Sequence, residues 1–166
     1  MHNQHATENV PADVADNVTG TPFPPGVLTA AAIDRLLDVH FPQIHLGGRI
    51  FFIEGAGVNR ARMRMMGHEK NLRPGNTLSG PSMFQLADLA LYAAILATLG
   101  EGAMQAVTTN LNINFLSRPS PGDLIAEATL IKVGKRLVVG EVDLFSANAD
   151  AMVAHAIATY AMPSRQ

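Results

Sequence analysis

The stretch Gly75–Gly100, GNTLSGPSMFQLADLALYAAILATLG, decides how this chain folds. It predicts one apolar helix from Pro81 to Leu99, since proline suits the first turn of a helix and glycine commonly follows the last one. Four alanines recur along that helix as a stripe of small residues: Ala87, Ala90, Ala94 and Ala97. The stretch carries a single formal charge, that of Asp88. A carboxylate near the middle of such a helix needs an explanation.

Downstream of this helix the hydrophobic pattern changes to the alternation that strands show. Residues 106–116, AVTTNLNINFL, place two sets of side chains on opposite faces: Val107, Thr109, Leu111, Ile113 and Phe115 on one, and Thr108, Asn110, Asn112 and Asn114 on the other. Residues 123–132, 136–145 and 151–162 continue as strands joined by short turns. Short connections between strands of similar length predict an antiparallel meander.

Upstream of the apolar helix the sequence predicts a shorter helix and two short strands. The helix covers residues 29–40, with Thr29 as its cap, and the strands fall within residues 48–66, separated by Gly55-Ala56-Gly57. One long apolar helix beside at least five antiparallel strands predicts an α+β domain, in which a sheet of five to six strands curls around the helix. Residues 1–26 are predicted to be a flexible N-terminal arm and residues 27–166 a single domain.

The composition narrows the class of protein. A chain of 166 residues, 48% of them hydrophobic, can bury one substantial core. The net charge of −2 provides no field that attracts nucleic acid or an anionic membrane. The absence of cysteine excludes disulfides, thiolate metal sites and a cysteine nucleophile. Neither a signal peptide nor an uninterrupted apolar run of about 20 residues is evident, so we expect a soluble cytoplasmic protein.

Asp88 has two competing interpretations. Aspartate is a poor residue for a helix interior, and among aliphatic neighbours its ionised form loses hydration. Proteins tolerate such a carboxylate where it acts as a base or a nucleophile. Alternatively, Asp88 lies on the exposed side of the helix or is held by a structural hydrogen bond. Gln85 and Tyr92 share its face and could orient a water or a substrate, or simply satisfy the carboxylate.

The turn before the helix, Ser79-Gly80-Pro81, is a second candidate. It offers free backbone N–H groups at a helix N-terminus, where the helix dipole favours negative charge. Such groups can stabilise the oxygen of a thioester or ester as it becomes an oxyanion. Capping of the helix is the simpler interpretation of Ser79 and Gly80.

Other motifs point less clearly to chemistry. Ser79 lacks the Gly-x-Ser-x-Gly context of a serine nucleophile, and the six histidines lack metal-ligand spacing. Arginines recur on one face of the strand predicted near residues 58–65: Arg60, Arg62 and Arg64. A solvated strand face is a better interpretation of these arginines than a phosphate site.

Two segments carry a resemblance to a known family. TLSGPSMFQLADLALYAA and AVTTNLNINFLSRPSPGDLIAEATLIKVGKRLVVGEVDLFS are similar to the hotdog-fold acyl-CoA thioesterases of the phenylacetate-degradation (PaaI-like) group, and the likeness runs from about residue 49 to residue 162. In that family a His-Gly-Gly turn opens the central helix, and the catalytic aspartate follows nine residues after the histidine. Asp88 matches that aspartate and Gly80 matches the first glycine. Ser79 replaces the histidine and Pro81 the second glycine.

The resemblance implies a mechanism and an assembly. It implies hydrolysis of an acyl-CoA thioester to a carboxylic acid and CoA, with Asp88 as general base or nucleophile and the Gly80 N–H as oxyanion donor. Ser79 and Asn76 would orient the carbonyl or the water, and no metal or redox cofactor is expected. It also implies a homodimer with sheets joined edge to edge, often paired into a homotetramer, with the site at the subunit interface.

The resemblance also suggests how the substrate binds. Three basic residues in or near loops could contact CoA phosphates: Arg118, Lys135 and Arg136. The second hypothesis is a non-catalytic acyl-CoA binding module with the same fold. A hydratase is less favoured, because hotdog hydratases usually need a histidine near the helix, and none lies between His68 and His155.

Overall fold

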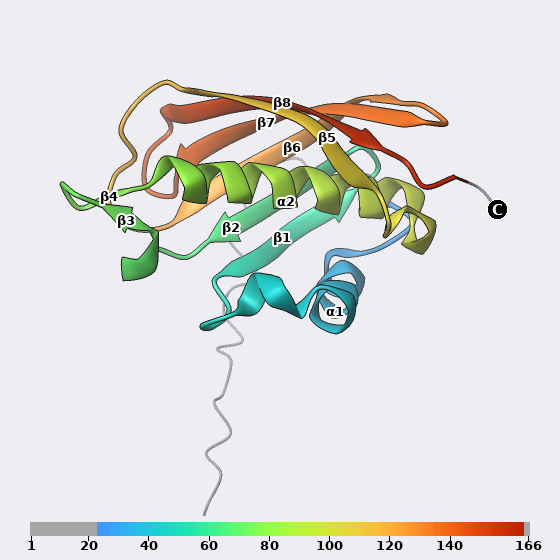
Figure 1. Cartoon of the computed structure of the whole chain (residues 1–166), viewed down its shortest axis with the longest axis horizontal. Coiled ribbons are helices and arrows are strands. Elements are labelled where there is room, and N and C mark those ends of the chain that lie inside the picture. The colour runs from blue at the N-terminus through green and yellow to red at the C-terminus, as the bar shows by residue number, and fades with distance from the viewer. Residues whose placement is uncertain (1–22, 165–166) are drawn as a thin grey trace, which may run out of the picture.

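The computed structural model describes residues 23–164, so most of the expected N-terminal arm lies outside the described residues. Figure 1 shows a sheet that curls around the long helix α2 (Gly80–Leu99). The strands of that sheet are β1 (Phe51–Gly57), β2 (Arg60–Met65), β5 (Val107–Phe115), β6 (Leu124–Val133), β7 (Leu137–Ser146) and β8 (Met152–Ala161). They run in the order β1-β2-β6-β7-β8-β5, and each neighbouring pair is antiparallel. The predicted α+β hotdog architecture is confirmed.

Helix α2 forms the core of the domain. Ser79 caps it by accepting a hydrogen bond from the Ser82 N–H at 3.3 Å, so Gly80 is its first residue and Pro81 its second. The four alanines of the predicted stripe are fully buried. Although α2 is long and apolar enough to cross a bilayer, most of it is buried inside the domain, which makes it a core helix.

Gly55 and Gly57 of β1 allow another segment of the chain to pack closely against the strand, and they do not form a turn. Strand β1 continues through Gly57, and the connection to β2 falls at Val58–Asn59, where Asn59 has a φ of 61°. The predicted break at Gly55-Ala56-Gly57 is therefore wrong. A Cβ on Gly55 would meet the ring of Phe23 at 2.3 Å, and a Cβ on Gly57 would meet the carbonyl oxygen of Pro24 at 2.0 Å. The missing side chains make room for the segment that leads into the domain.

Helix α1 (Ala30–His40) covers the β1 side of the core. Thr29 caps it through a hydrogen bond from the Ala32 N–H at 3.2 Å, as predicted, and Ile33 and Leu37 face the core. A short 3₁₀ helix, Pro42–His45, follows directly and leads towards β1.

Two small elements lie between β2 and α2. After a 3₁₀ turn, Glu69–Asn71, strands β3 (Leu72–Arg73) and β4 (Thr77–Leu78) form a hairpin. Strands of two residues are too short to show alternation, so the sequence pattern does not reveal them. The hairpin leads the chain into the start of α2.

Candidate active site

Asp88 is held by two hydroxyl groups from neighbouring strands. Its Oδ1 atom accepts a hydrogen bond from the Tyr160 hydroxyl at 2.6 Å and another from the Thr108 hydroxyl at 2.7 Å. The Tyr160 hydroxyl also lies 2.9 Å from the Asp88 carbonyl oxygen. The carboxylate thus faces the sheet next to the β5–β8 pair, on the side of α2 away from its buried alanines.

A β-bulge brings Thr108 to this side of the sheet. Thr108 pairs with Tyr160 and Asn110 with Thr159, which leaves Thr109 as the extra residue in β5. The bulge shifts the alternation by one residue, so that Thr108 lies on the helix-facing side with Leu111. The predicted placement of Thr108 on the same face as the asparagines is therefore wrong.

Tyr160 is a buried hydrogen-bond donor. Its side chain is 3% exposed, and its ring stacks on that of Tyr92 with centroids 6.3 Å apart and planes 6° apart. Burial raises the pKa of Tyr160, and the nearby Asp88 carboxylate raises it further. Burial also raises the pKa of Tyr92, whose hydroxyl donates to the Met104 carbonyl at 2.6 Å. Both tyrosines therefore keep their protons at neutral pH.

A hollow of about 600 Å³ opens next to the carboxylate, and we call it the Asp88 hollow. Its lining combines apolar and aromatic side chains with a few polar ones: His40, Phe41, Asp88, Leu89, Tyr92, Met104, Gln105, Ala106, Val107, Thr108 and Tyr160. This size and mixed chemistry are typical of small-molecule sites. Of the two residues predicted to share the face of Asp88, Tyr92 lines this hollow, whereas Gln85 is exposed and is not part of the lining.

The start of α2 carries a polar network. The hydroxyls of Ser79 and Ser82 lie 2.9 Å apart, and the side-chain amide of Asn71 donates to Ser82 at 3.0 Å. The Asn71 carbonyl also accepts from the Ser79 N–H at 2.8 Å. Ser79 is therefore a helix cap held in place by Asn71, the last residue of the 3₁₀ turn before the hairpin. Gly80 is the first residue of the helix, so no carbonyl of a preceding helical turn accepts a hydrogen bond from its N–H.

Gly80 lines a second hollow, of about 330 Å³, which we call the Gly80 hollow. Phe115 and Arg118 share the lining, and a Cβ on Gly80 would meet the Phe115 ring at 3.2 Å. Asp88 does not line this hollow. The two residues are eight positions apart, which is about 12 Å along the helix axis. Within one subunit, the carboxylate and the Gly80 N–H therefore face different spaces.

The other predicted site residues are spread over the domain. Asn76 is exposed in the β3–β4 turn with a φ of 52°, and it does not line the Gly80 hollow. Arg118 lies in the loop before β6, whereas Lys135 and Arg136 lie in the turn after it and line a third hollow of about 620 Å³. Figure 1 shows this loop and this turn at opposite ends of the ten-residue strand β6.

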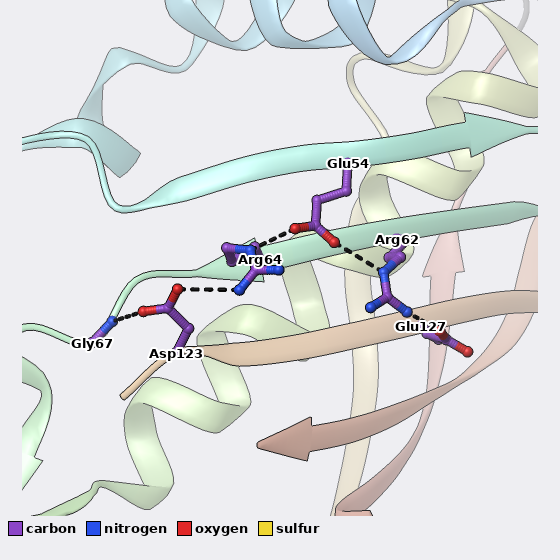
Figure 2. A network of polar contacts seen from close by, with 6 residues as sticks. All are labelled: Glu54, Arg62, Arg64, Gly67, Asp123 and Glu127. Carbon is purple, nitrogen blue, oxygen red and sulfur yellow. Dashed lines mark hydrogen bonds and ion pairs between the residues drawn. The ribbon is translucent and has the colours of Figure 1, made fainter. Parts of the chain in front are cut away.

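Carboxylates pair with two of the three arginines on the outer face of β2, Arg62 and Arg64, whereas the Arg60 guanidinium lies 5.6 Å from the centroid of the Phe23 ring. Figure 2 shows Glu54 between Arg62 and Arg64, with Asp123 and Glu127 completing the network. Arg62 donates to Glu54 at 2.9 Å, and Arg64 contacts Asp123 at 3.1 Å. Burial disfavours the charge on Arg64, but its hydrogen bond to Glu54 and the attraction of the two carboxylates outweigh burial and raise its pKa. Around Arg62 and Arg64 this face is an ion-pair network rather than simply a solvated surface.

The comparisons with known proteins match this fold and this helix. A model of the Thioesterase superfamily matches residues 75–152, which include the start of α2 and Asp88. A candidate esterase from Halobacterium salinarum is 34% identical over 119 residues, which are 69% of this chain and 76% of that protein.

Solved structures agree with these matches. A candidate thioesterase from Silicibacter sp. TM1040 is 42% identical with a TM-score of 0.75, over 84% of this chain and 94% of that chain. The PaaI protein of the E. coli phenylacetic acid degradation operon shares the fold, with 21% identity and a TM-score of 0.67 over 80% of this chain and 91% of that chain. By sequence and by fold, the chain belongs to the thioesterase superfamily, as a hotdog hydrolase of thioester or ester type.

Proposed function

We propose that this protein is an acyl-CoA thioesterase whose catalytic carboxylate is Asp88. The observation that carries the proposal is the setting of Asp88: a carboxylate held through one oxygen by two hydroxyls, at the wall of a hollow of about 600 Å³. A structural aspartate needs donors but no space in front of it. A base or a nucleophile needs both.

The reaction has two routes through Asp88. As a general base, the carboxylate takes a proton from a water, which attacks the thioester carbonyl and expels the CoA thiolate. As a nucleophile, it attacks the carbonyl itself and forms a mixed anhydride, which water then hydrolyses. Both routes end in a carboxylic acid and CoA, and both build negative charge on the carbonyl oxygen. Neither needs a metal or a redox cofactor.

The N–H of Gly80 is the proposed donor to that oxygen, assisted by the dipole of α2. A side chain at position 80 would press against the Phe115 ring and obstruct the helix start. Because Gly80 has none, a carbonyl could approach its N–H closely. Ser79 would hold the helix start in place as its cap, and Asn76 would act from the hairpin turn. Serine cannot exchange a proton at neutral pH as the family's histidine does, so we assign no proton transfer to Ser79.

The complete site is proposed to form between two subunits. One subunit separates Gly80 from Asp88 by about 12 Å along α2, too far for a single carbonyl to contact both. A homodimer with two-fold symmetry can place the helix start of one subunit opposite the Asp88 of the other. Strand β5 lies at an edge of the sheet and offers unpaired backbone groups for such an association. Two dimers could then pair into a homotetramer.

The substrate would occupy spaces on both sides of the carbonyl. The acyl group would lie in the Asp88 hollow against Tyr92 and its apolar neighbours, and Gln85 would lie along its exposed approach. Arg118, Lys135 and Arg136 would contact the phosphates of CoA. Because Arg118 is remote from the other two in one subunit, a single CoA would meet all three only at a subunit interface.

A panel of acyl-CoA thioesters tests the proposal. The purified protein is mixed with short, medium, long and aryl acyl-CoA compounds, and free thiol is recorded with a chromogenic disulfide. We expect turnover of at least one compound, reduced by about 10²-fold or more in Asp88→Asn. Ser79 in place of the histidine favours one alternative, a non-catalytic acyl-CoA binding module. Binding of acyl-CoA in calorimetry without thiol release would support that alternative and contradict the enzyme.

A further inference from the structure

Two hydroxyls converge on one oxygen of Asp88. Tyr160 and Thr108 are cross-strand partners, and their hydroxyls lie 2.6 and 2.7 Å from Oδ1. A hydrogen bond from a hydroxyl to an ionised carboxylate is stronger than one between neutral groups. No hydrogen bond to Oδ2 is found among residues 23–164. The two oxygens of the same carboxylate are therefore differently placed: Oδ1 is held and Oδ2 remains available.

The donor from β8 is rigidly supported. The Tyr160 ring is buried and stacks on Tyr92, which is itself fixed because its hydroxyl donates to the Met104 carbonyl at 2.6 Å. Tyr92 lies one turn after Asp88 on α2, so one face of the helix carries both the carboxylate and the support of its donor. A donor held in this way limits the rotation of the carboxylate.

We propose that Tyr160 is a positioning residue for the reaction: its hydroxyl fixes Oδ1 of Asp88, so that Oδ2 is the oxygen that meets the water or the thioester carbonyl. This inference rests on the proposed function, and it names a residue that the sequence pattern gives no reason to choose. Tyr160 acts through Asp88 and keeps its own proton. Losing its hydroxyl would remove one of the two donors to Oδ1 and leave the carboxylate freer to rotate.

The variant Tyr160→Phe keeps the stacked ring and removes the hydroxyl alone. We expect kcat to fall by about tenfold or more while KM changes less than about twofold, since binding groups are untouched. The acidic limb of the rate profile should move to higher pH. The other titratable groups that line the hollow are His40 and Tyr92, and they are the same in both proteins. A shift between the two profiles therefore reports on the Tyr160–Asp88 contact.

A double-variant cycle tests whether Tyr160 works through Asp88. In the Asp88→Asn background, Tyr160→Phe should cause no further loss of turnover, because the carboxylate it positions is absent. The matched control is Thr98→Val, which removes another partly buried hydroxyl of α2, one that donates to the Ala94 carbonyl at 2.7 Å. That control should lower the melting temperature and leave kcat and the pH profile unchanged. An equal loss from Tyr160→Phe in both backgrounds would overturn the proposal.

A second readout does not depend on activity. In ¹³C-aspartate-labelled protein, the Asp88 carboxyl signal is identified by its absence in Asp88→Asn. Its chemical shift at neutral pH should change in Tyr160→Phe, which removes a donor to Oδ1, and should stay the same in Thr98→Val. An unchanged signal in Tyr160→Phe overturns the role of Tyr160 whatever the parent hydrolyses. A parent that releases no thiol from any acyl-CoA, with a changed signal, overturns the proposed function and leaves the hold of Tyr160 on the carboxylate supported.

Discussion

Glu54 and Asp88 are both carboxylates partly enclosed by the fold, but their partners differ in kind. Glu54 lies on the outer side of the sheet and binds two arginines, one through each oxygen. Asp88 lies on the inner side and binds two neutral hydroxyls through a single oxygen. The first carboxylate is neutralised and fully used. The second, Asp88, is held by neutral donors on Oδ1 alone, and it faces a hollow.

Under the proposed function, this difference separates a structural carboxylate, Glu54, from a catalytic one, Asp88. A carboxylate whose two oxygens both bind arginines has no oxygen available to a substrate. Removing that carboxylate leaves the arginine charges without partners. A carboxylate held by neutral donors keeps a free lone pair and an unneutralised charge, which a base or a nucleophile requires. Four predictions that leave Asp88 itself in place follow from this account, from the largest expected effect to the smallest.

The largest of these effects is expected for Glu54→Gln. The amide cannot neutralise Arg62 and Arg64, so the free energy of unfolding should fall by about 1–3 kcal/mol. Turnover per folded molecule should stay within about twofold of the parent, because the network lies on the outer face. Urea unfolding monitored by circular dichroism gives the first quantity and thiol release the second. A variant of normal stability and low turnover would reverse the assignment of the two carboxylates.

Thr108→Val tests the longer of the two hydroxyl contacts at Asp88, the 2.7 Å hydrogen bond from Thr108. Removing one charge-assisted hydrogen bond should lower kcat by about tenfold. Thr108→Ser keeps the hydroxyl and should retain most of the activity, which makes it the matched control. If the valine and serine variants lose activity equally, the shape of the side chain rather than its hydroxyl is responsible.

Lys135 and Arg136 test the proposed contact with CoA. Replacing both with alanine should raise KM for an acyl-CoA by about three- to tenfold and leave kcat unchanged, since exposed ion pairs contribute modestly. The effect should shrink in high salt and disappear with a short thioester that lacks the nucleotide. An unchanged KM for acyl-CoA at low salt would remove these two residues from the binding site.

The smallest effect concerns a third carboxylate, Asp34. It contacts Arg49 at 2.8 Å, yet burial raises its pKa above the ordinary 3.8. At pH values between the ordinary pKa and the raised pKa of the folded state, the folded protein holds a proton on Asp34 that the unfolded chain has released. The free energy of unfolding therefore falls as pH rises through that window. Asp34→Asn removes this dependence. Relative to the parent, the variant should gain stability by under about 1 kcal/mol between pH 4 and 7. A relative loss of stability over that range in urea unfolding would contradict the sign.

Much of the fold could be predicted from the sequence because its signals are local. The proline and glycine at the two ends of α2 and the alternation of the last four strands lie within short windows. The missed features depend on distant partners. Gly55 and Gly57 suggest a turn until the segment at Phe23 and Pro24 is seen against them.

The candidate site was only partly predictable for the same reason. Asp88 stood out as a charge in an apolar helix, and the family motif indicated Gly80. Tyr160 lies 72 residues from Asp88, and Thr108 reaches it only because a bulge at Thr109 shifts the face of β5. A strict period of two cannot reveal a bulge. Gln85 was chosen by its spacing from Asp88, and Asn76 was chosen with the family resemblance. Gln85 does not line the Asp88 hollow, and Asn76 does not line the Gly80 hollow.

Asp88→Asn, measured for thioester hydrolysis and for melting on the same preparation, tests the central claim most directly. The substitution removes a charge and a proton acceptor with little change of shape. Turnover should fall by about 10²-fold or more, while the melting temperature and acyl-CoA binding stay close to those of the parent. A lower melting temperature with unchanged turnover per folded molecule would contradict the account, because Asp88 would then be a structural residue like Glu54.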